Sequence, residues 1–499
     1  MTDRATTAAV LDLDGTLPDD LAGKELLGGK AYSVHRMRAL GLPVPPAFVL
    51  PTPVCGVFHD NGRALPEEIW DDVVAAVGRL EQATGHTFGA GPSPLLVSVR
   101  SGAAQSMPGM MDTVLNLGLT AELVEVLAEQ TGDRAWAEDT WRRFREGYAT
   151  TVCGDEHAVP PTDPWEQLRA AIGAVFDSWT NERVRAYRAR HQLGEGGGTA
   201  VTVQAMVFGN RDEQSATGVL FSRDPSTGEP TLYGEWMAQA QGEDVVAGTS
   251  TPEPLATLGE RWPALGAQIA EMAARLEREH RDLVDVEFTI ESGTLYLLQC
   301  RAGKRSALAA VRIAADLVAE GLIAPAEALS RVSADQVAAV REVAASGPVG
   351  DVLARGSAAG PGRASGVAVS DEDEAGALAD AGTPFVLVRH ATEPEDVPLM
   401  FESVAVVTEV GGATSHAALV CREIGLPCVV GVGEGTIAGL VGRLVTVDGT
   451  TGVVVEGEQA AAADDVPAAE NPHLASLLAL AAEHAEAGAH LRDALAVTG

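Results

Sequence analysis

The sequence predicts an α/β fold, because short apolar runs typical of strands alternate along the chain with stretches of helical spacing. The clearest series lies in residues 364–457, where turns or helical sequence separate GVAVS, FVLVR, VAVVT, CVVGV, LVTVD and GVVVEG. The chain has 499 residues, of which 46% are hydrophobic. This length indicates about three domains, and the apolar fraction is large enough to bury a sizeable core.

Residues 1–345 are predicted to form one domain, which contains a helical insertion at about 120–198. Strand-like runs lie on both sides of the insertion: AFVL before Pro51, LLVSVR, AVTVQAMVF, TGVLFS, DVEFTI and TLYLLQC. A long helix is expected at about 262–280, and helices rich in Ala, Val and Leu are expected at 304–345.

Residues 346–363, GPVGDVLARGSAAGPGRA, contain Gly, Pro and Ser at high density and are predicted to be a linker between domains. The compact unit at 364–457 follows this linker. The remaining residues, 458–499, are rich in Ala and Glu and predict a helical tail.

The net charge of the chain excludes some classes of binding partner. Asp and Glu number 70, Lys and Arg number 35, and the formal net charge is −35. Such a field repels a nucleic-acid duplex and an anionic membrane surface, so neither is an expected partner. Phosphate groups can still bind if the few cations are concentrated in one place. The position of each lysine is therefore informative, and the chain has only Lys24, Lys30 and Lys304.

The five cysteines are scattered and form no CxxC pair, which indicates a reducing compartment without disulfides or a zinc site. The first residues, MTDRATTAAVLDLDG, carry acids where a signal peptide needs a basic stretch and then an apolar one. No run of about 20 uncharged apolar residues is present, so no membrane span is expected. These features predict a cytoplasmic protein.

The first candidate for chemistry is GGATSHAALVCREIGLPCVVGVG at 411–433. Thr414 or Ser415 is a natural N-cap, which places His416 in the first turn of a helix whose unbonded N–H groups attract anions. A histidine there can act as a nucleophile, and the helix end would stabilise a phosphoryl group attached to it. The alternative is a histidine that only packs or caps. The Gly-Gly turn and the two hydroxyls favour chemistry.

Two further constellations contain phosphate-binding residue types. Lys30 follows Gly28-Gly29, and Arg100 ends a strand before the small-residue loop SGAAQSMPGMMD. Small residues let the backbone approach a phosphate closely, which favours a binding role for both cations. The alternative for Lys30 is a solvated lysine at a helix end.

The other constellation is a hairpin, in which DVEFTIE and LYLLQCR flank Ser292-Gly293-Thr294. A turn centred on Gly293 sets Glu287 opposite Gln299 and Asp285 opposite Arg301. Oxygen ligands of this kind suit Mg²⁺, and Arg301 with Lys304 could hold phosphates. The alternative is a solvated hairpin face with cross-strand ion pairs, and a shift of one residue in register would remove the arrangement.

VLDLDGT at 10–16 fits a phosphatase signature with Asp12 and Asp14 as the acids. That chemistry needs further motifs downstream, whereas this chain enters LLGGK within a few residues. We therefore interpret the segment as a strand and a polar turn. Cys421 and Cys428 are interpreted as packing residues.

Together the motifs resemble those of the phosphoenolpyruvate-utilising enzymes, and most closely pyruvate phosphate dikinase. The resemblance covers most of residues 22–455. Besides the His416 segment, the matching stretches are ARGSAAGPGRASGVAV, EPEDVPLM, LLGGKAYSVHRMRALGLPVPPAF, PLLVSVRSGAAQSMPGMMDTVLNLGL, VQAMVFGN, GVLFSRDPSTGEPTLYGEW, AQGEDVVAG and DVEFTIESGTLYLLQCRAGKR. The resemblance implies an α+β ATP-grasp domain with a helical insertion, followed by a swivelling α/β phosphohistidine domain.

The resemblance also implies roles for individual residues. His416 would carry the phosphoryl group, supported by Thr414 and Ser415. The residues implied for ATP are Lys30, Arg100 and Arg301 at the phosphates, Asp285, Glu235 and Glu243 lining the nucleotide site, and Gln204 to Phe208 as the strand and hinge near the adenine. Glu287 and Gln299 would bind Mg²⁺. The family has a second arginine in RSGARASMPG where this chain has Ala104, which puts part of the phosphate grip or the specificity in doubt.

A dikinase ends in a pyruvate-binding barrel, which needs about 250 residues, and too few residues follow the His416 unit. The expected activity is therefore the first half-reaction, in which ATP phosphorylates His416 with orthophosphate as co-substrate. The acceptor would lie elsewhere, on a separate barrel chain of a split dikinase or as another small molecule. A degenerate nucleotide-binding module is the non-enzymatic alternative. Self-association into a homo-oligomer is compatible with the sequence.

Overall fold

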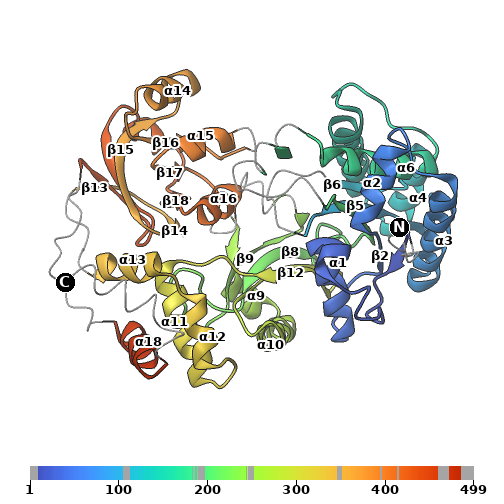
Figure 1. The fold of residues 1–499 in the computed structure, drawn as a ribbon. Coiled ribbons are helices and arrows are strands. Elements are labelled where there is room, and N and C mark those ends of the chain that lie inside the picture. Colours follow the sequence, from blue (N-terminus) through green and yellow to red (C-terminus); the bar gives the residue numbers. More distant parts are fainter. Residues whose placement is uncertain are drawn as a thin grey trace. The chain divides into compact units, whose positions relative to one another are not determined.

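A computed structural model describes residues 9–104, 113–181, 184–185, 188, 197–242, 244, 252–344, 351–393, 396–412, 415–458 and 471–484. Figure 1 shows the helices and strands of the chain, coloured along the sequence. The chain divides into two units, each assembled from two segments. Unit 1 consists of Met1–Ala216 and Phe288–Arg301, and unit 2 consists of Thr217–Glu287 and Ala302–Gly499.

Unit 1 is built around a five-stranded sheet with the order β1-β2-β7-β5-β6. Its strands pair antiparallel throughout and are β1 (Leu11–Asp12), β2 (Ala47–Leu50), β7 (Ala200–Ala205), β5 (Val97–Gly102) and β6 (Thr113–Leu117). The helices before the predicted insertion are α1 (Lys24–Ala39), α2 (Thr52–Asp60) and α3 (Glu67–Thr84), and a short ribbon pairs β3 (Thr87–Phe88) with β4 (Pro94–Leu95). Strand β7 is the middle strand of this order, and all six of its residues are buried.

The described residues of the predicted insertion, 120–198, contain helices and no strand. The helices are α4 (Ala121–Thr131), α5 (Arg134–Tyr148), the π-helix η1 (Ala149–Cys153) and α6 (Pro164–Ser178). Side chains cap the α-helices at their N-termini, since Thr120, Asp133 and Asp163 each accept a backbone N–H of the first turn. Their apolar faces join the strands of unit 1 in one core.

A second five-stranded sheet has the order β10-β9-β8-β11-β12. Its strands are β10 (Glu253–Pro254), β9 (Tyr233–Ala238), β8 (Ala216–Phe221), β11 (Val284–Glu291) and β12 (Thr294–Ala302), and the accompanying helices are α9 (Leu255–Arg261) and α10 (Pro263–His280). The turn between β11 and β12 uses Ser292 and Gly293, both with positive φ, of 47° and 79°. Two such residues in succession are typical of a tight hairpin turn, as the sequence predicts.

Four helices form a separate apolar cluster in unit 2: α11 (Ala307–Ala319), α12 (Pro325–Arg331), α13 (Ala334–Ala344) and α18 (Pro472–Glu483). Helix α18 lies within the predicted helical tail, and its residues Leu474, Leu477 and Ala481 are buried in this cluster. The tail therefore contributes to a core in unit 2. Among the described residues, no helix combines the length and the apolar character needed to cross a membrane.

An eight-stranded sheet in unit 2 has the order β13-β20-β19-β15-β16-β17-β18-β14. The strands are β13 (Val352–Arg355), β14 (Ser357–Gly360), β15 (Arg363–Val369), β16 (Phe385–Arg389), β17 (Ala405–Thr408), β18 (Cys428–Val430), β19 (Leu444–Asp448) and β20 (Val453–Glu456). The helices are α14 (Glu372–Asp380), α15 (Val397–Glu402), α16 (His416–Ile424) and α17 (Ile437–Leu440). Strands β15 to β18 run parallel, which confirms the α/β fold class for this part of the chain.

Strands β13 and β14 lie inside the range 346–363 that the sequence predicts as a linker. They pair antiparallel with β20 and β18, at the two ends of the eight-stranded sheet. The described part of that range, from residue 351 onward, is therefore largely built into the sheet. Its small residues serve close packing, since a Cβ atom at Gly360 would overlap the carbonyl of Leu426.

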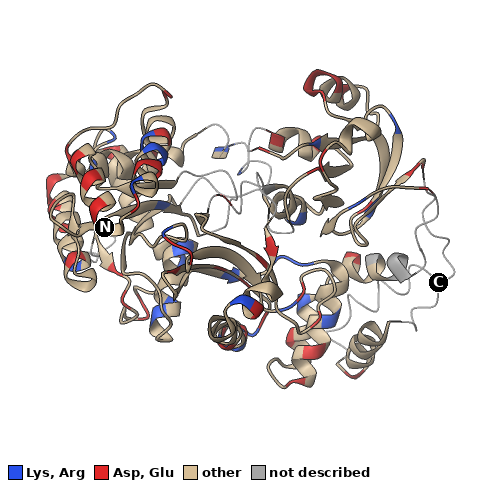
Figure 2. Ribbon diagram, turned by 180° about the vertical axis from the view of Figure 1, so that it is seen from behind, with Lys and Arg blue, Asp and Glu red and all other residues tan. Residues whose placement is uncertain are grey.

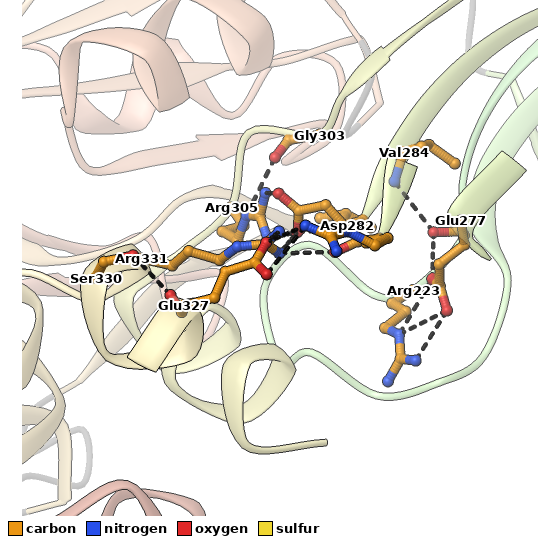
Figure 3. Close-up of polar contacts among 12 residues, drawn as sticks. Arg223, Glu277, Asp282, Val284, Gly303, Arg305, Glu327, Ser330 and Arg331 are labelled. Carbon is orange, nitrogen blue, oxygen red and sulfur yellow. Dashed lines mark hydrogen bonds and ion pairs between the residues drawn. The ribbon is translucent and has the colours of Figure 1, made fainter. Parts of the chain in front are cut away.

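Acidic positions are spread over helices of both units, and basic positions are fewer (Figure 2). Several arginines in unit 2 are paired directly with acids. Arg223, whose side chain is 3% exposed, donates to both Glu277 and Glu320 at 2.8 Å. Arg305 pairs with Asp282, and Arg331 on α12 pairs with Glu327 (Figure 3). Arg223 thus joins the segment after β8 to α10 and to the end of α11, whereas the Arg331–Glu327 pair lies within α12.

Candidate functional site

Lys30 lies directly after a break in α1. Gly28 has φ 72° and ψ 161°, which is not helical, and the helix resumes beyond it. The N–H of Gly29 donates to the carbonyl of Ala103 at 2.8 Å, and a Cβ atom at Gly28 would overlap the carbonyl of Gly102. Glycine at position 28 is therefore required by both the backbone angle and the close approach, and the contact joins the Lys30 segment to the end of β5.

Arg100 lies on that same strand β5, opposite Thr202 of β7 and Thr113 of β6. Its side chain and that of Lys30 are each half-buried. A Cβ atom at Gly102 would lie 3.7 Å from Cβ of Lys30, so the lysine starts close to the strand that carries Arg100. Two predicted phosphate ligands are thus held by neighbouring backbone segments of unit 1.

Arg301 is brought to α1 by a third contact within unit 1. The N–H of Cys300 donates to the hydroxyl of Ser33 at 2.7 Å. Ser33 lies about one helical turn beyond Lys30, and Cys300 directly precedes Arg301. Unit 1 therefore brings together the segments that bear Lys30, Arg100 and Arg301, a set of cations suited to a polyphosphate.

Gln204 is held within the sheet of unit 1. Its side chain is 2% exposed, and its amide donates to the carbonyl of Pro45 at 3.2 Å. Further along, Phe208 packs edge-on against Trp136, with ring centroids 5.2 Å apart. The segment from Gln204 to Phe208, predicted as the strand and hinge near the adenine, thus begins at the end of β7 and finishes at an aromatic residue packed on Trp136. Ala104 is described, whereas residues 105–112 of the loop after it lie outside the described residues.

The predicted acids of unit 2 lie on two strands of the second sheet. Glu235 is on β9, and Asp285 and Glu287 are on the same face of β11 because they are two residues apart. Asp285 is buried, and Glu235 and Glu287 are half-buried. Near Glu235, burial and then the Glu235 charge raise the pKa of Tyr233 to about 12, so that tyrosine is neutral. Glu243 lies outside the described residues.

The predicted metal pair lies on the hairpin β11–β12. The two residues lie on neighbouring strands of one sheet, Glu287 on β11 and Gln299 on β12. Gln299 is 8% exposed, and its Oε1 atom has no hydrogen-bond partner among the described residues. A buried acceptor left without a donor fits a hard cation such as Mg²⁺. Clusters of three or more His, Cys, Asp or Glu suited to a metal are absent from the described residues.

Helix α16 begins at His416, with Ser415 as the N-cap residue in extended conformation. Gly425, with φ 72°, ends the helix as the sequence predicts. The Ser415 hydroxyl does not cap the helix, and among the described residues its buried oxygen has no hydrogen-bond partner. The helix end therefore offers first-turn N–H groups that the helix itself does not bond, and one hydroxyl without a partner among the described residues, beside His416. Thr414 lies outside the described residues.

The loop before His416 lies against an acid of the second sheet. A Cβ atom at Gly412 would overlap the carboxylate of Glu235, so a larger residue there would require the Glu235 side chain to move. Both residues belong to unit 2. The contact brings the segment that carries His416 to a strand with a predicted nucleotide-site residue.

Sequence reasoning missed two features in the part of unit 2 that contains the eight-stranded sheet. His390 follows β16, and its Nδ1 atom lies 3.0 Å from Oε2 of Glu409, which follows β17. This hydrogen bond holds the pKa of Glu409 below its usual value. The position of polar residues after two buried parallel strands was the signal that could have found the pair. The other feature is Arg422 on α16, which nothing in the local sequence distinguishes.

The phosphatase-like segment has the structure that the sequence interpretation favours, a strand and a polar turn. Thr16 donates to Oδ1 of Asp14 from its N–H at 2.9 Å and from its hydroxyl at 2.7 Å. Burial acts to raise the pKa of Asp14, but the bonds from Thr16 outweigh it and lower the pKa. Asp12 pairs with Arg79 at 2.7 Å. Both acids are thus engaged in local contacts.

Comparison with known proteins defines the class to which these domains belong. Residues 61–265 match the family described as pyruvate phosphate dikinase, AMP/ATP-binding domain, and residues 382–452 match PEP-utilising enzyme, mobile domain. The resemblance predicted from the sequence is therefore confirmed. The chain carries the AMP/ATP-binding and mobile domains of the phosphoenolpyruvate-utilising enzymes.

Individual relatives are pyruvate, phosphate dikinases. The chain is 41% identical over 505 residues to that of Rhizobium meliloti (strain 1021), an alignment that covers 87% of this chain and 56% of the relative. It is 40% identical to that of Clostridium symbiosum, with the same coverage. It is 39% identical to the chloroplastic enzyme 1 of Arabidopsis thaliana, over 92% of this chain and 53% of the relative. The chain thus spans about half the length of the curated relatives it matches.

Proposed function

We propose that this chain is an ATP-dependent phosphotransferase that phosphorylates its own His416 and delivers the phosphoryl group to an acceptor bound outside residues 1–499. The observation that carries the proposal is the approach of the Gly412 loop to Glu235, because it brings the His416 segment to the acids of the second sheet. The cations of unit 1 and the acceptor oxygen of Gln299 support the binding of a nucleotide polyphosphate with its metal.

The proposed reaction follows the chemistry of the relatives. A neutral imidazole nitrogen of His416 attacks the β-phosphorus of ATP, the bond from that phosphorus to the AMP oxygen breaks, and AMP leaves. An oxygen of orthophosphate then attacks the terminal phosphorus, so that pyrophosphate leaves and phosphohistidine remains. Lys30, Arg100 and Arg301 would neutralise the phosphate charge, and free N–H groups at the start of α16 would hold the group on His416.

In this proposal Glu287 and Gln299 hold Mg²⁺, which neutralises charge on the phosphate oxygens when bound. Asp285, Glu235 and Glu243 line the nucleotide site, and Gln204 to Phe208 lie near the adenine. Thr414 and Ser415 support the phosphoryl group. The mobile domain would swivel relative to the nucleotide-binding domain, as the resemblance implies.

The test is incubation with ATP labelled at the β-phosphorus, with and without orthophosphate. We expect label on His416 that is lost in acid and stable in base, and none on His416→Asn. His157→Asn is the matched control, because that histidine is exposed in a loop of unit 1, and it should label like the original chain. Absence of label in the original chain would leave only the binding-module alternative.

The acceptor is tested by adding compounds to the labelled protein. In the split-dikinase proposal, label passes to pyruvate only when a second, pyruvate-binding chain is present. Transfer to another small molecule without a partner would favour a different phosphotransferase. Pyruvate, phosphate dikinase is the name of all the relatives described above, which makes pyruvate the first acceptor to try.

A further inference from the structure

Arg422 lies on α16, on the same nine-residue helix that begins at His416. Its Nε donates to the carbonyl of Ala359, on β14, at 2.6 Å. Beyond that bond, the guanidinium carbon lies 5.5 Å from the ring centroid of Phe221, which is fully buried on β8. The side chain thus reaches from the helix of the mobile domain to the second sheet, and all of these residues belong to unit 2.

The outer part of this guanidinium is buried without hydrogen-bond partners. Neither Nη1 nor Nη2 of Arg422 has one among the described residues. Burial lowers the pKa of Arg422, and the ionisable groups that act against this are Tyr233, Asp285, Cys428 and Glu235, of which only Asp285 and Glu235 are carboxylates. A buried cation whose outer nitrogen atoms have no partner is costly unless nearby anions attract it. Asp285 and Glu235, both predicted to line the nucleotide site, supply that attraction.

The helix therefore meets the second sheet at two places. The first is the loop before its N-terminus, where Gly412 lies against Glu235. The second is Arg422, near the other end of the helix, against Phe221. One contact would leave the helix free to rotate about it, whereas two contacts at opposite ends fix its direction. The direction of the helix sets where its first residue, His416, is presented.

We propose that Arg422 is the positioning residue that docks α16 on the nucleotide-binding sheet while His416 takes the phosphoryl group from ATP. The interaction joins a cation on the helix to an aromatic ring and two acids on the sheet. Arg422 touches no reacting atom in this proposal and acts by holding His416 in place. The inference rests on the proposed function, because it assigns a role within the same transfer.

The test separates docking from the chemistry of the histidine. Arg422→Met keeps the apolar stem and removes the cation, so we expect His416 labelling by ATP to slow at least tenfold. The small donor phosphoramidate phosphorylates histidine without a nucleotide site, its P–N bond breaking as ammonia leaves. Labelling by phosphoramidate should be unchanged, as should ATP binding. Arg443→Met is the matched control, because Arg443 is exposed in the same domain, and both labels should persist.

A second variant changes the residue on the sheet side of the contact, Phe221. Phe221→Leu removes the ring below the guanidinium and leaves the mobile domain unaltered. Phe221→Leu should also slow labelling of His416 by ATP. In the double variant with Arg422→Met, the fold reduction in the labelling rate should be smaller than the product of the two single reductions.

Three results would overturn the proposal. Equal ATP labelling of Arg422→Met and the original chain would show that the residue does not position the helix. Loss of labelling by both donors would assign Arg422 to the stability of the mobile domain alone. If the original chain is labelled by phosphoramidate and not by ATP, the proposed function fails, and this inference fails with it.

Discussion

The predicted metal site depends most directly on one atom, Oε1 of Gln299. It is buried, it accepts no hydrogen bond from the described residues, and it lies on the strand next to the one that carries Glu287. Replacing the side chain by leucine conserves its approximate size and removes the oxygen. The residue thus offers a direct test of the metal assignment.

Gln299→Leu should weaken the binding of ATP in the presence of Mg²⁺ by about 10–100-fold, the range typical when a metal-site partner is lost. Calorimetric titration with and without Mg²⁺ measures this effect, which should largely disappear when the metal is chelated. Gln268→Leu, at an exposed position of α10, is the control and should bind ATP normally. Equal affinities for both variants would contradict the assignment.

Gly28→Ala should reduce both stability and ATP affinity. A positive φ alone costs a non-glycine residue about 1–2 kcal/mol, and the added methyl group would also displace Gly102, on the same strand as Arg100. Gly41→Ala is the matched control, because Gly41 has φ 68° with no atom within 4 Å of the added Cβ. Thermal unfolding and nucleotide titration should show the larger loss for Gly28→Ala. An equal loss of stability in both variants, with ATP affinity intact, would exclude the overlap with Gly102.

Strands and helices could be predicted where their signals are local. Pro263 starts α10 and the apolar period continues to His280, so the expected range of 262–280 is nearly the observed one. The sequence LARGSAAG contains few residues that favour strands, and β13 and β14 form because β20 and β18 supply pairing partners. Long-range pairing of this kind has no local sequence signal.

Residues of the candidate site also divide into those with a local sequence signal and those placed by long-range contacts. Gly28-Gly29 beside Lys30, and a hydroxyl before His416, are local patterns that identify candidates. The contact of Arg422 with Phe221 joins residues about 200 positions apart and could not be predicted from either segment.

At the scale of elements, Arg223 connects β8 to helices α10 and α11 through Glu277 and Glu320. Arg223→Met should destabilise unit 2 by an amount near the lower end of about 3–5 kcal/mol, because two acids lose their buried partner. Glu320 is 41% exposed and can turn to water, which limits the loss. Urea unfolding measures the change. Arg443→Met should change stability by less than about 0.5 kcal/mol, and a similarly small change for Arg223→Met would contradict the prediction.

For the molecule as a whole, the excess of 70 acids over 35 bases implies mutual repulsion in the folded state (Figure 2). Raising the salt concentration from about 0.01 M to about 0.2 M shortens the screening length below about 10 Å, so the midpoint of thermal unfolding should rise. Sodium chloride and choline chloride should give the same increase, since screening does not depend on the cation. A fall in the midpoint, or a rise with sodium alone, would contradict this explanation.

The two units share one hairpin, since the chain leaves unit 2 after Glu287 and returns to it after Arg301. No single cleavage of the polypeptide can therefore release either unit whole. A fragment ending at Ala216 would lack Phe288–Arg301, which belong to unit 1. The remaining fragment would contain those residues without the rest of unit 1. Dissecting the protein thus calls for a circular permutation or for grafting the missing strand onto the shorter piece.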